Sequence, residues 1–390
     1  MAVNAMQITD IYQILNSIHN QATGKVALAP TNTAEFVSQA TATLAAGTDA
    51  VYNALMDVSM NPIFSVRDYT EKFKGLYKKD EEWGAIRRKI SYADRDINED
   101  AIKTWQPVDG DSADQWVIKK EDILEMRFYG SAVYEDHFTV FEDQLKTAFS
   151  SPDQLGSFVS NQVTHNNNKY KQYRENLSRA TLANFIGAKV YLDNGIVHLL
   201  TEYNAETGLS LTAQTVYQPG NMEPFFRWVR AKINTLGRMM SERSSEYQFA
   251  VQGKNINRHT GPQYLKMYID SASLDKIDAM VNTTTYHDEP LAYADVEGVN
   301  FWQSIKSPHE INVTPSYTAA NGTVATAPAQ NVQKIFGVMF DQDAIGINQY
   351  FYAVRNTPVN ARRLYYNTWL HARMQYMNDL TEKGIILLLD

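Results

Sequence analysis

The sequence of 390 residues contains no cysteine. Without thiols the chain cannot form a disulfide, carry a cysteine nucleophile or bind a metal through thiolates. This excludes disulfide-stapled domains, cysteine proteases and zinc ribbons. A cysteine-free chain fits a reducing cytoplasm, or an assembly whose stability comes from burial between subunits.

Long apolar runs and an excess of basic residues are missing as well. The most apolar segment, Ile385 to Leu389, is far too short to span a bilayer, and Met1 to Asp10 lacks the pattern of a signal peptide. We therefore expect no membrane contact. With 36 Lys and Arg against 44 Asp and Glu, the net charge is -8. The main function of such an acidic chain is not expected to be binding to nucleic-acid phosphates.

No catalytic or cofactor-binding constellation stands out. There is no Gly-x-Ser-x-Gly elbow and no His pair at helical spacing, and Gly253-Lys254 lacks the other glycine of a phosphate loop. His287-Asp288-Glu289 before Pro290 is interpreted as a turn, because adjacent residues in an extended chain point to different faces. Asp341-Gln342-Asp343 fails the spacing of a calcium loop. We predict a protein that is not an enzyme, with no cofactor and no metal.

The composition is that of a folded protein, with 44% hydrophobic and 21% charged residues. Its length allows two or three domains. Tyrosine is abundant, with 23 residues against 16 Phe and 6 Trp. Because tyrosine buries a large ring and keeps its hydroxyl wet, the surplus suits interfaces, and it suits β-rich cores as well.

The first 130 residues predict two helices, an arm and a long hairpin. Apolar residues recur at helical spacing from Ile8 to Ile18 and again in 51–60, whereas the Gly/Ala/Thr-rich segment 24–49 favours an extended arm. Residues 86–92 alternate as a strand, and the return strand is expected at 116–120, continuing through 126–130. The intervening tip is acidic and includes Asp94, Asp96, Asp109 and Asp111.

This hairpin is either a functional extension or a solvated loop of no special purpose, and the pattern alone favours neither. Its strand carries Arg87, Arg88 and Lys89, which alternation divides between two faces. An inter-subunit contact with an acidic surface is a better interpretation than a nucleic-acid groove. Reversing all three to Glu is expected to leave the subunit folded and to impair assembly.

The rest of the chain predicts a long helix followed by mixed structure. Ser151-Pro152-Asp153-Gln154 is a helix start, and the apolar spacing continues to about Lys189, a length of roughly 55 Å. A second helix is expected from Pro224 to Met240, and 312–330 is expected to be an irregular or β-edge loop. Residues 364–377 and 384–390 predict two strands that close the sheet. This C-terminal part is basic, with Arg355, Arg362, Arg363 and Arg373.

Taken in order, several segments resemble the major capsid proteins of tailed bacteriophages with the Hong Kong 97 fold, and more specifically those of small, short-tailed phages. They are DIY…QATG at 10–24, NPIFS at 61–65, WG…KI at 83–90, FSSPD at 149–153, FDQDA at 340–344 and NDLTE at 378–382. Together they span essentially the whole chain, and their order carries the resemblance.

The resemblance implies an α+β fold of the Hong Kong 97 type. Its parts would be an N-terminal arm at 1–64, an extended β-hairpin loop at 65–130, a peripheral domain with a spine helix at 131–190 and 361–390, and an axial domain at 191–360. The candidate inter-subunit contacts are Arg87, Arg88, Lys89, Asp94, Asp96, Asp109, Asp111, Arg362 and Arg363.

The implied function is a structural protein that self-assembles as hexamers and pentamers into an icosahedral capsid around the double-stranded DNA genome. The implied partners are a separate scaffolding protein, since the arm is short, a portal, and decoration or head-fibre proteins. Packaged DNA would lie on the inner face without sequence-specific binding. The implied location is the virion, after assembly in the host bacterial cytoplasm.

Two alternatives remain open at this point. An encapsulin-like compartment shell would hold cargo enzyme instead of DNA. A β-rich hydrolase acting on polysaccharide would need a cleft with two carboxyl groups roughly 5–9.5 Å apart.

Overall fold

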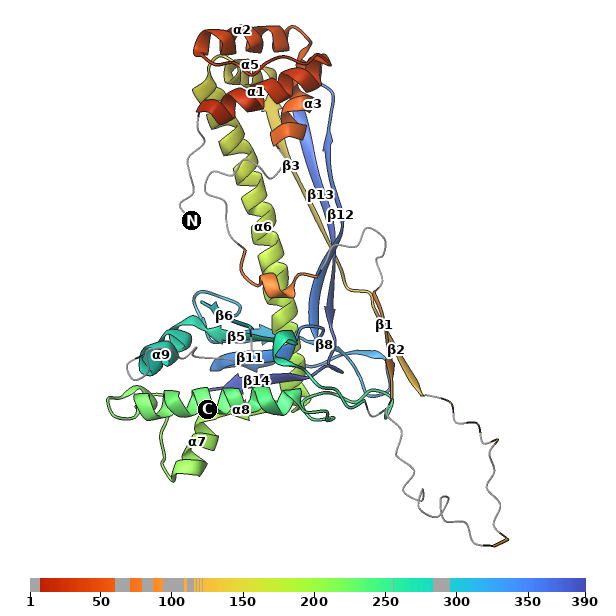
Figure 1. The fold of residues 1–390 in the computed structure, drawn as a ribbon, viewed down its shortest axis with the longest axis vertical. Coiled ribbons are helices and arrows are strands. Elements are labelled where there is room, and N and C mark those ends of the chain that lie inside the picture. Colours follow the sequence, from red (N-terminus) through yellow and green to blue (C-terminus); the bar gives the residue numbers. More distant parts are fainter. Residues whose placement is uncertain are drawn as a thin grey trace. The chain divides into compact units, whose positions relative to one another are not determined.

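The computed structural model describes residues 8–59, 71–78, 87–93, 109–110, 116, 118, 120, 122–254, 256–282 and 295–390. The chain folds as two compact units (Figure 1). Unit 1 comprises Met1–Lys74, Ala132–Leu177 and Gln349–Met374; unit 2 comprises Gly75–Ser131, Ser178–Asn348 and Gln375–Asp390. Helices and strands are mixed in both units, so the α+β class is confirmed.

Three helices begin unit 1: α1 (Ile8–Thr23), α2 (Thr33–Leu44) and α3 (Thr48–Ser59). The first and third confirm the two predicted helices. The expectation of an extended segment across 24–49 is wrong, because α2 occupies its middle. The side chain of Asn32 caps this helix by accepting a hydrogen bond from the Glu35 backbone N–H at 2.9 Å. Phe36 and Ala40, four residues apart, supply its buried face.

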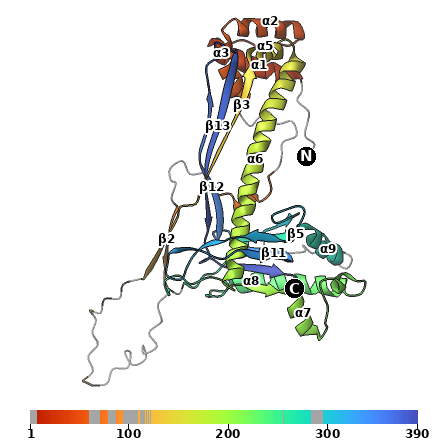
Figure 2. The same cartoon turned by 180° about the vertical axis from the view of Figure 1, so that it is seen from behind.

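A three-stranded sheet completes unit 1, with β12 (Ile345–Asn356), β13 (Tyr365–Asn378) and β3 (Ser131–Phe141) in the order β12-β13-β3. Helix α5 (Glu142–Ala148) follows β3. Helices α1, α2, α3 and α5 gather around one end of this sheet (Figure 2). The core there includes Tyr52, whose ring stacks on Tyr366 with centroids 4.3 Å apart. Burial raises the pKa of Tyr52 to about 12.

Helix α6 (Pro152–Tyr191) has 40 residues and contributes to both units. It begins where predicted, and the Ser151 hydroxyl accepts a hydrogen bond from the Gln154 N–H at 3.3 Å. Gly156 and the Asn run at 166–168 do not interrupt it. Its apolar face supplies Leu155 and Val159 to the core of unit 1. The predicted long helix is confirmed.

Unit 2 is built on a five-stranded sheet in the order β4-β14-β11-β5-β6. Strand β11 pairs antiparallel with both neighbours, whereas each edge strand pairs in parallel. The strands are β4 (Ile196–His198), β14 (Gly384–Leu388), β11 (Ile335–Asp341), β5 (Leu265–Asp270) and β6 (Asp295–Val299). Every residue of β11 and β14 is buried, which explains their continuous apolar sequences.

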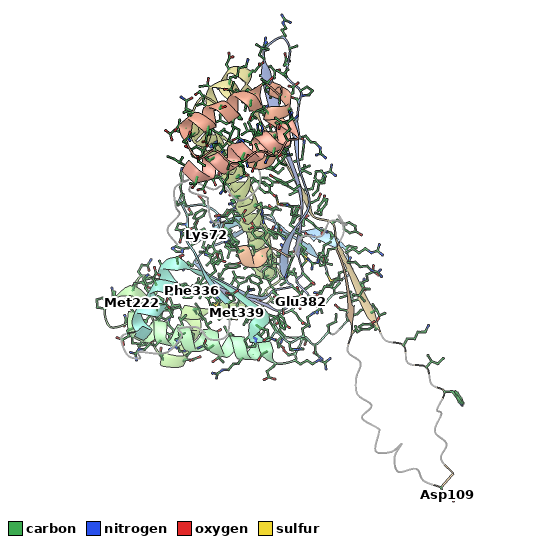
Figure 3. All side chains as sticks on the ribbon, turned by 45° about the horizontal axis from the view of Figure 1, so that its top comes forward. Lys72, Asp109, Met222, Phe336, Met339 and Glu382 are labelled. Atoms are coloured by element: carbon green, nitrogen blue, oxygen red, sulfur yellow. The ribbon has the colours of Figure 1, made fainter. Side chains whose placement is uncertain are left out.

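Helices α7 (Leu199–Thr207), α8 (Met222–Ser241) and α9 (Ser271–Asn282) accompany this sheet. Helix α8 confirms the predicted helix at 224–240, and its apolar stripe shares a core with Phe336 and Met339 of β11 (Figure 3). Three 3-10 turns lie at Lys74–Leu76, Thr215–Tyr217 and Pro262–Tyr264.

The segment 312–330 forms small β-hairpins, as the β-edge prediction allowed. Strand β7 (Ile311–Val313) pairs with β10 (Gln330–Val332), and β8 (Ser316–Thr318) pairs with β9 (Val324–Thr326). The two predicted C-terminal strands exist as β13 and β14. They do not close one sheet together, because β13 joins the three-stranded sheet and β14 the five-stranded one.

Candidate subunit interface

The predicted long hairpin is present in unit 2 as β1 (Arg87–Tyr92) paired antiparallel with β2 (Ile123–Phe128). Lys89 lies opposite Met126, and Tyr92 lies opposite Ile123. The return strand starts later than expected, since Trp116, Ile118 and Lys120, the described residues of 116–120, lie outside any strand.

The two faces of the hairpin differ in exposure. Leu124, Met126 and Phe128 point inward and pack with Val251, Ile256 and Met377. The opposite face leaves Ile90 48% exposed and Tyr92 63% exposed. The apolar residues of β1 therefore lie on its outer face. Exposed apolar side chains on a projecting hairpin are typical of a protein–protein contact.

Lys89 lies on the inner face and is bound within its own chain. Its Nζ is 2.5 Å from Asp379 Oδ2 and also contacts Glu382, and both of these carboxyl groups are buried. Arg258 contacts Glu382 at 2.7 Å and donates to Ser91 Oγ at 3.0 Å. Burial raises the pKa of Glu382, while Lys89 and Arg258 oppose the rise. Lys89 thus joins the hairpin to the turn between β13 and β14, so the expectation that it is dispensable for folding is revised.

Arg88 lies on the outer face, where its guanidinium contacts Glu125 at 2.9 Å. Arg127 contacts the same carboxylate at 2.7 Å. Hydrogen bonds from Arg127 and Arg88 lower the pKa of Glu125. Arg87 is half-buried opposite Phe128. The predicted division of these three cations between two faces is confirmed, and their contacts with another subunit stay a prediction.

The acidic residues of the tip can be placed only in part. Asp109 is exposed in a turn with Gly110, whose φ of 95° suits glycine (Figure 3). Asp94, Asp96 and Asp111 lie outside the described residues.

Arg362 and Arg363 lie in unit 1, in the exposed connection between β12 and β13. Both backbone N–H groups donate to the Asn360 side-chain oxygen, at 3.1 and 3.2 Å. The turn thereby holds two guanidinium groups at the surface. They belong to a different unit from Arg87 and Arg88, which lie in unit 2.

The turn Asp379–Lys383 was missed by the interpretation of the sequence. All five residues are buried although three are charged. Lys383 Nζ donates to Glu242 O at 2.6 Å and to Ser244 Oγ at 3.0 Å. The segment was missed because a charged segment between two apolar strands has the pattern of a surface turn. The one feature of the sequence that could have indicated burial is the high density of charged residues just before β14.

A second buried lysine lies beside this turn. Lys189 of α6 donates to Asn194 Oδ1 at 2.6 Å and to the Tyr247 carbonyl at 2.7 Å. Burial lowers its pKa to about 7, and Asp379 acts in the opposite direction. Unit 2 therefore contains several buried charges that are satisfied within the chain.

The tyrosines divide between core and surface. Tyr52, Tyr268 and Tyr366 are almost fully buried, whereas Tyr92 and Tyr129 are more than half exposed. Part of the tyrosine surplus therefore serves the core, and the exposed tyrosines remain available for an interface. Among the described residues, no group of three or more His, Asp or Glu is placed to hold a metal ion. No described helix is long and apolar enough to cross a membrane.

Comparison with solved structures finds phage capsid folds. The chain is similar to a chain of the capsid structure of Staphylococcus phage Andhra, with a TM-score of 0.54, 10% identity, and coverage of 84% of this chain and 86% of that chain. It is also similar to a chain in the structure of the head fiber and inner core protein gp22 of native bacteriophage P68, with a TM-score of 0.52, 10% identity and the same coverage. At this identity the similarity shows the fold.

Comparison with curated protein sequences finds no significant match. A family model does match, over residues 11–388, and its description is Phi29-like phage major capsid protein. The match covers nearly the whole chain, including both units, the hairpin and the long helix. The resemblance to capsid proteins of phages is confirmed. The chain belongs to the Phi29-like phage major capsid protein family and is a structural protein of the phage capsid.

Proposed function

We propose that this capsid protein forms an icosahedral head as hexamers and pentamers and encloses a double-stranded DNA genome. The observation that carries the proposal is the family match across residues 11–388. The long helix and the projecting hairpin support assignment to the Hong Kong 97 fold. On that assignment the arm is 1–64, the extended loop 65–130, the peripheral domain 131–190 with 361–390, and the axial domain 191–360.

The contacts between subunits would use the exposed side of the hairpin and the basic turn. Arg88 and Asp109 of the hairpin are proposed contacts on exposed surface, as are Arg362 and Arg363. Arg87, which is half-buried on the inner face of β1, is retained from the sequence. Asp94, Asp96 and Asp111 are retained from the sequence. Lys89 is assigned a supporting role, because its ammonium group is already occupied by Asp379 and Glu382. A contact with exposed charges would set orientation and partner choice more than raw affinity.

The proposed partners are further copies of the chain, a separate scaffolding protein, a portal, and decoration or head-fibre proteins. The similar P68 structure is one of a head fiber and an inner core protein of that phage. The net charge of -8 suits a wall that faces packed DNA without binding it tightly. Assembly would take place in the host bacterial cytoplasm, and no catalytic group or cofactor is needed.

An encapsulin-like shell is not favoured, because the matched family is one of phage capsid proteins. The experiment is to express the chain alone and together with its phage's other head proteins, and to examine sedimentation and electron micrographs. We expect closed particles or sheets in the co-expressed sample. A chain that stays monomeric in both samples would contradict the proposal, and copurified cargo enzyme in place of head proteins would favour the encapsulin alternative.

A further inference from the structure

A groove of about 490 Å³ lies in unit 1 between α5 and the start of α6. Its floor includes the buried Ala148 and the half-buried Phe158. Asp143 and Asp153 are exposed on its rim. The chain's described cations form no ion pair with either carboxylate, whereas the neighbouring Glu142 is paired with Lys146 at 2.8 Å. The groove therefore combines an apolar floor with two available negative charges.

The basic turn at 362–364 has the complementary properties. Arg362 and Arg363 are exposed, and within the described residues neither guanidinium has an ion-pair partner. Leu364, the next residue, is 50% exposed and has a φ of 54°, a left-handed conformation that a leucine rarely adopts. The turn thus offers two cations and one apolar side chain side by side.

The turn and the groove are neighbours in the same subunit. The Glu142 N–H at the start of α5 donates to the Leu364 carbonyl at 2.9 Å. Even so, the arginines of the turn do not reach Asp143 or Asp153 within ion-pair distance. Each isolated subunit therefore presents adjacent positive and negative side chains that form no ion pair within the part of the chain that the structure describes, although Lys146 lies near enough to Asp143 to interact with it.

We propose that the turn 362–364 of one subunit docks into the groove formed by α5 and α6 of a second copy of the chain. Arg362 and Arg363 would contact Asp143 and Asp153, and Leu364 would cover the floor beside Phe158. Because both patches lie together, two copies related by a twofold axis could make the contact reciprocally. The contact is small, which suits a shell whose individual contacts must allow correction during assembly. The proposal rests on the proposed capsid function and names one of its contacts.

A purely structural role of Asp143 and Asp153 can be separated from a docking role by the choice of variants. Asp143 and Asp153 lie in the first turns of their helices, where a carboxylate stabilises the helix without any partner. That role predicts that lysine at these positions harms the subunit whatever charge the turn carries. A docking role predicts instead that reversing the turn as well restores the contact.

The first experiment reverses charge on one or both sides of the contact. We expect Arg362→Glu with Arg363→Glu, and separately Asp143→Lys with Asp153→Lys, to raise the protein concentration needed for particle formation about tenfold. The four substitutions in one chain should return it to within about twofold of the wild-type value. Arg355→Glu, an exposed arginine of β12 outside both the groove and the turn, is the matched control and should leave the concentration unchanged.

The second experiment uses the absence of cysteine, which allows cross-linking without background. Two chains are co-assembled, one with Thr147→Cys in the groove and one with Ala361→Cys beside the turn, and treated with a short bismaleimide. We expect a covalent dimer in several-fold excess over that formed when Ala205→Cys on α7 replaces Thr147→Cys.

Equal cross-linking of the two pairs, or four-residue variants that fold but do not recover assembly, would overturn the docking proposal. A second protein that cross-links to Thr147→Cys while Ala361→Cys does not would assign the groove to another partner and also overturn it. If the wild-type chain forms no particles, the proposed function fails and the docking proposal falls with it. Normal wild-type assembly with unaffected reversed variants would reject the docking alone.

Discussion

Arg88 and Lys89 are adjacent in β1 and carry the same charge, yet the structure uses them differently. Arg88 points outward and shares the exposed carboxylate of Glu125 with Arg127. Lys89 points inward and contacts Asp379 and Glu382, which lie 290 and 293 positions further along the chain. The side chain of Asp379 has no exposed surface. One residue of the pair therefore supports the fold, and the other remains available at the surface.

Burial is the physical difference between the two sites. An exposed ion pair gains little, because water solvates each charge almost as well as its partner does. A buried carboxylate has lost its water, so removing its cation leaves a buried charge without a counter-ion. The comparison predicts that substitutions at buried charges act on folding, whereas substitutions at exposed charges act on assembly.

The largest effect is expected for Lys89→Met. The substitution keeps the length of the side chain but removes the ion-pair partner of Asp379, which keeps its hydrogen bonds from Thr381, and leaves Glu382 paired with Arg258 alone. We expect the free energy of unfolding of the unassembled subunit to fall by about 3 kcal/mol, measured by urea denaturation. The base of the hairpin should also exchange its amide hydrogens faster.

The control adds Glu382→Gln to Lys89→Met, which removes one of the buried negative charges. This double variant should recover part of the lost stability. If Lys89→Met is as stable as the wild type, the inner and outer faces of β1 do not differ as the comparison requires.

Much of the fold could be predicted because local patterns determine it. The start of α6 carries a serine cap, a proline at the first helical position and an acidic first turn, and α8 has one apolar stripe. The segment 33–44 was missed because its helix is built mainly from small residues. Phe36 is the only large, fully buried side chain of this helix. Its ring packs in a core shared with α1 and α3, and the short-range spacing of apolar residues does not reveal such a contact.

The candidate site was less predictable, because its contacts join distant parts of the sequence. Alternation correctly assigned Arg88 and Lys89 to opposite faces, but it could not say which face is covered. The cover comes from Val251, Ile256 and 377–382, far along the chain. The groove between α5 and α6 likewise depends on how two helices meet, which no motif in 143–158 records.

A second buried charge, Lys189, provides a test through pH. Its folded-state pKa of about 7 lies below the ordinary value of 10.5, so the folded state releases this proton more readily than the unfolded chain. The stability that this group contributes is therefore fully present above its unfolded-state pKa of 10.5. It is lost as the pH falls through the folded-state pKa of about 7. Between about pH 7 and pH 9, the free energy of unfolding should therefore rise by up to about 1.4 kcal/mol per pH unit from this group.

The variant Lys189→Met should remove that rise, as measured by urea denaturation at several pH values. Lys232→Met is the matched control, since this lysine pairs with Glu202 at 2.5 Å on the surface of α8 and should leave the slope unchanged. A slope that survives in Lys189→Met would show that the buried ammonium is not its source.

The smallest effect on stability is expected for Arg88→Glu. The side chain of Arg88 is 57% exposed, and Glu125 keeps Arg127 as a partner, so the midpoint of urea denaturation should not change measurably. Assembly should nevertheless be impaired, because the reversal changes the charge that the outer face presents to another subunit. Arg227→Glu, which breaks an exposed pair with Glu223 on α8, is the matched control for a surface reversal outside the hairpin. If Arg88→Glu destabilises the subunit as strongly as Lys89→Met, or assembles as well as Arg227→Glu, then exposure does not separate the two roles in β1.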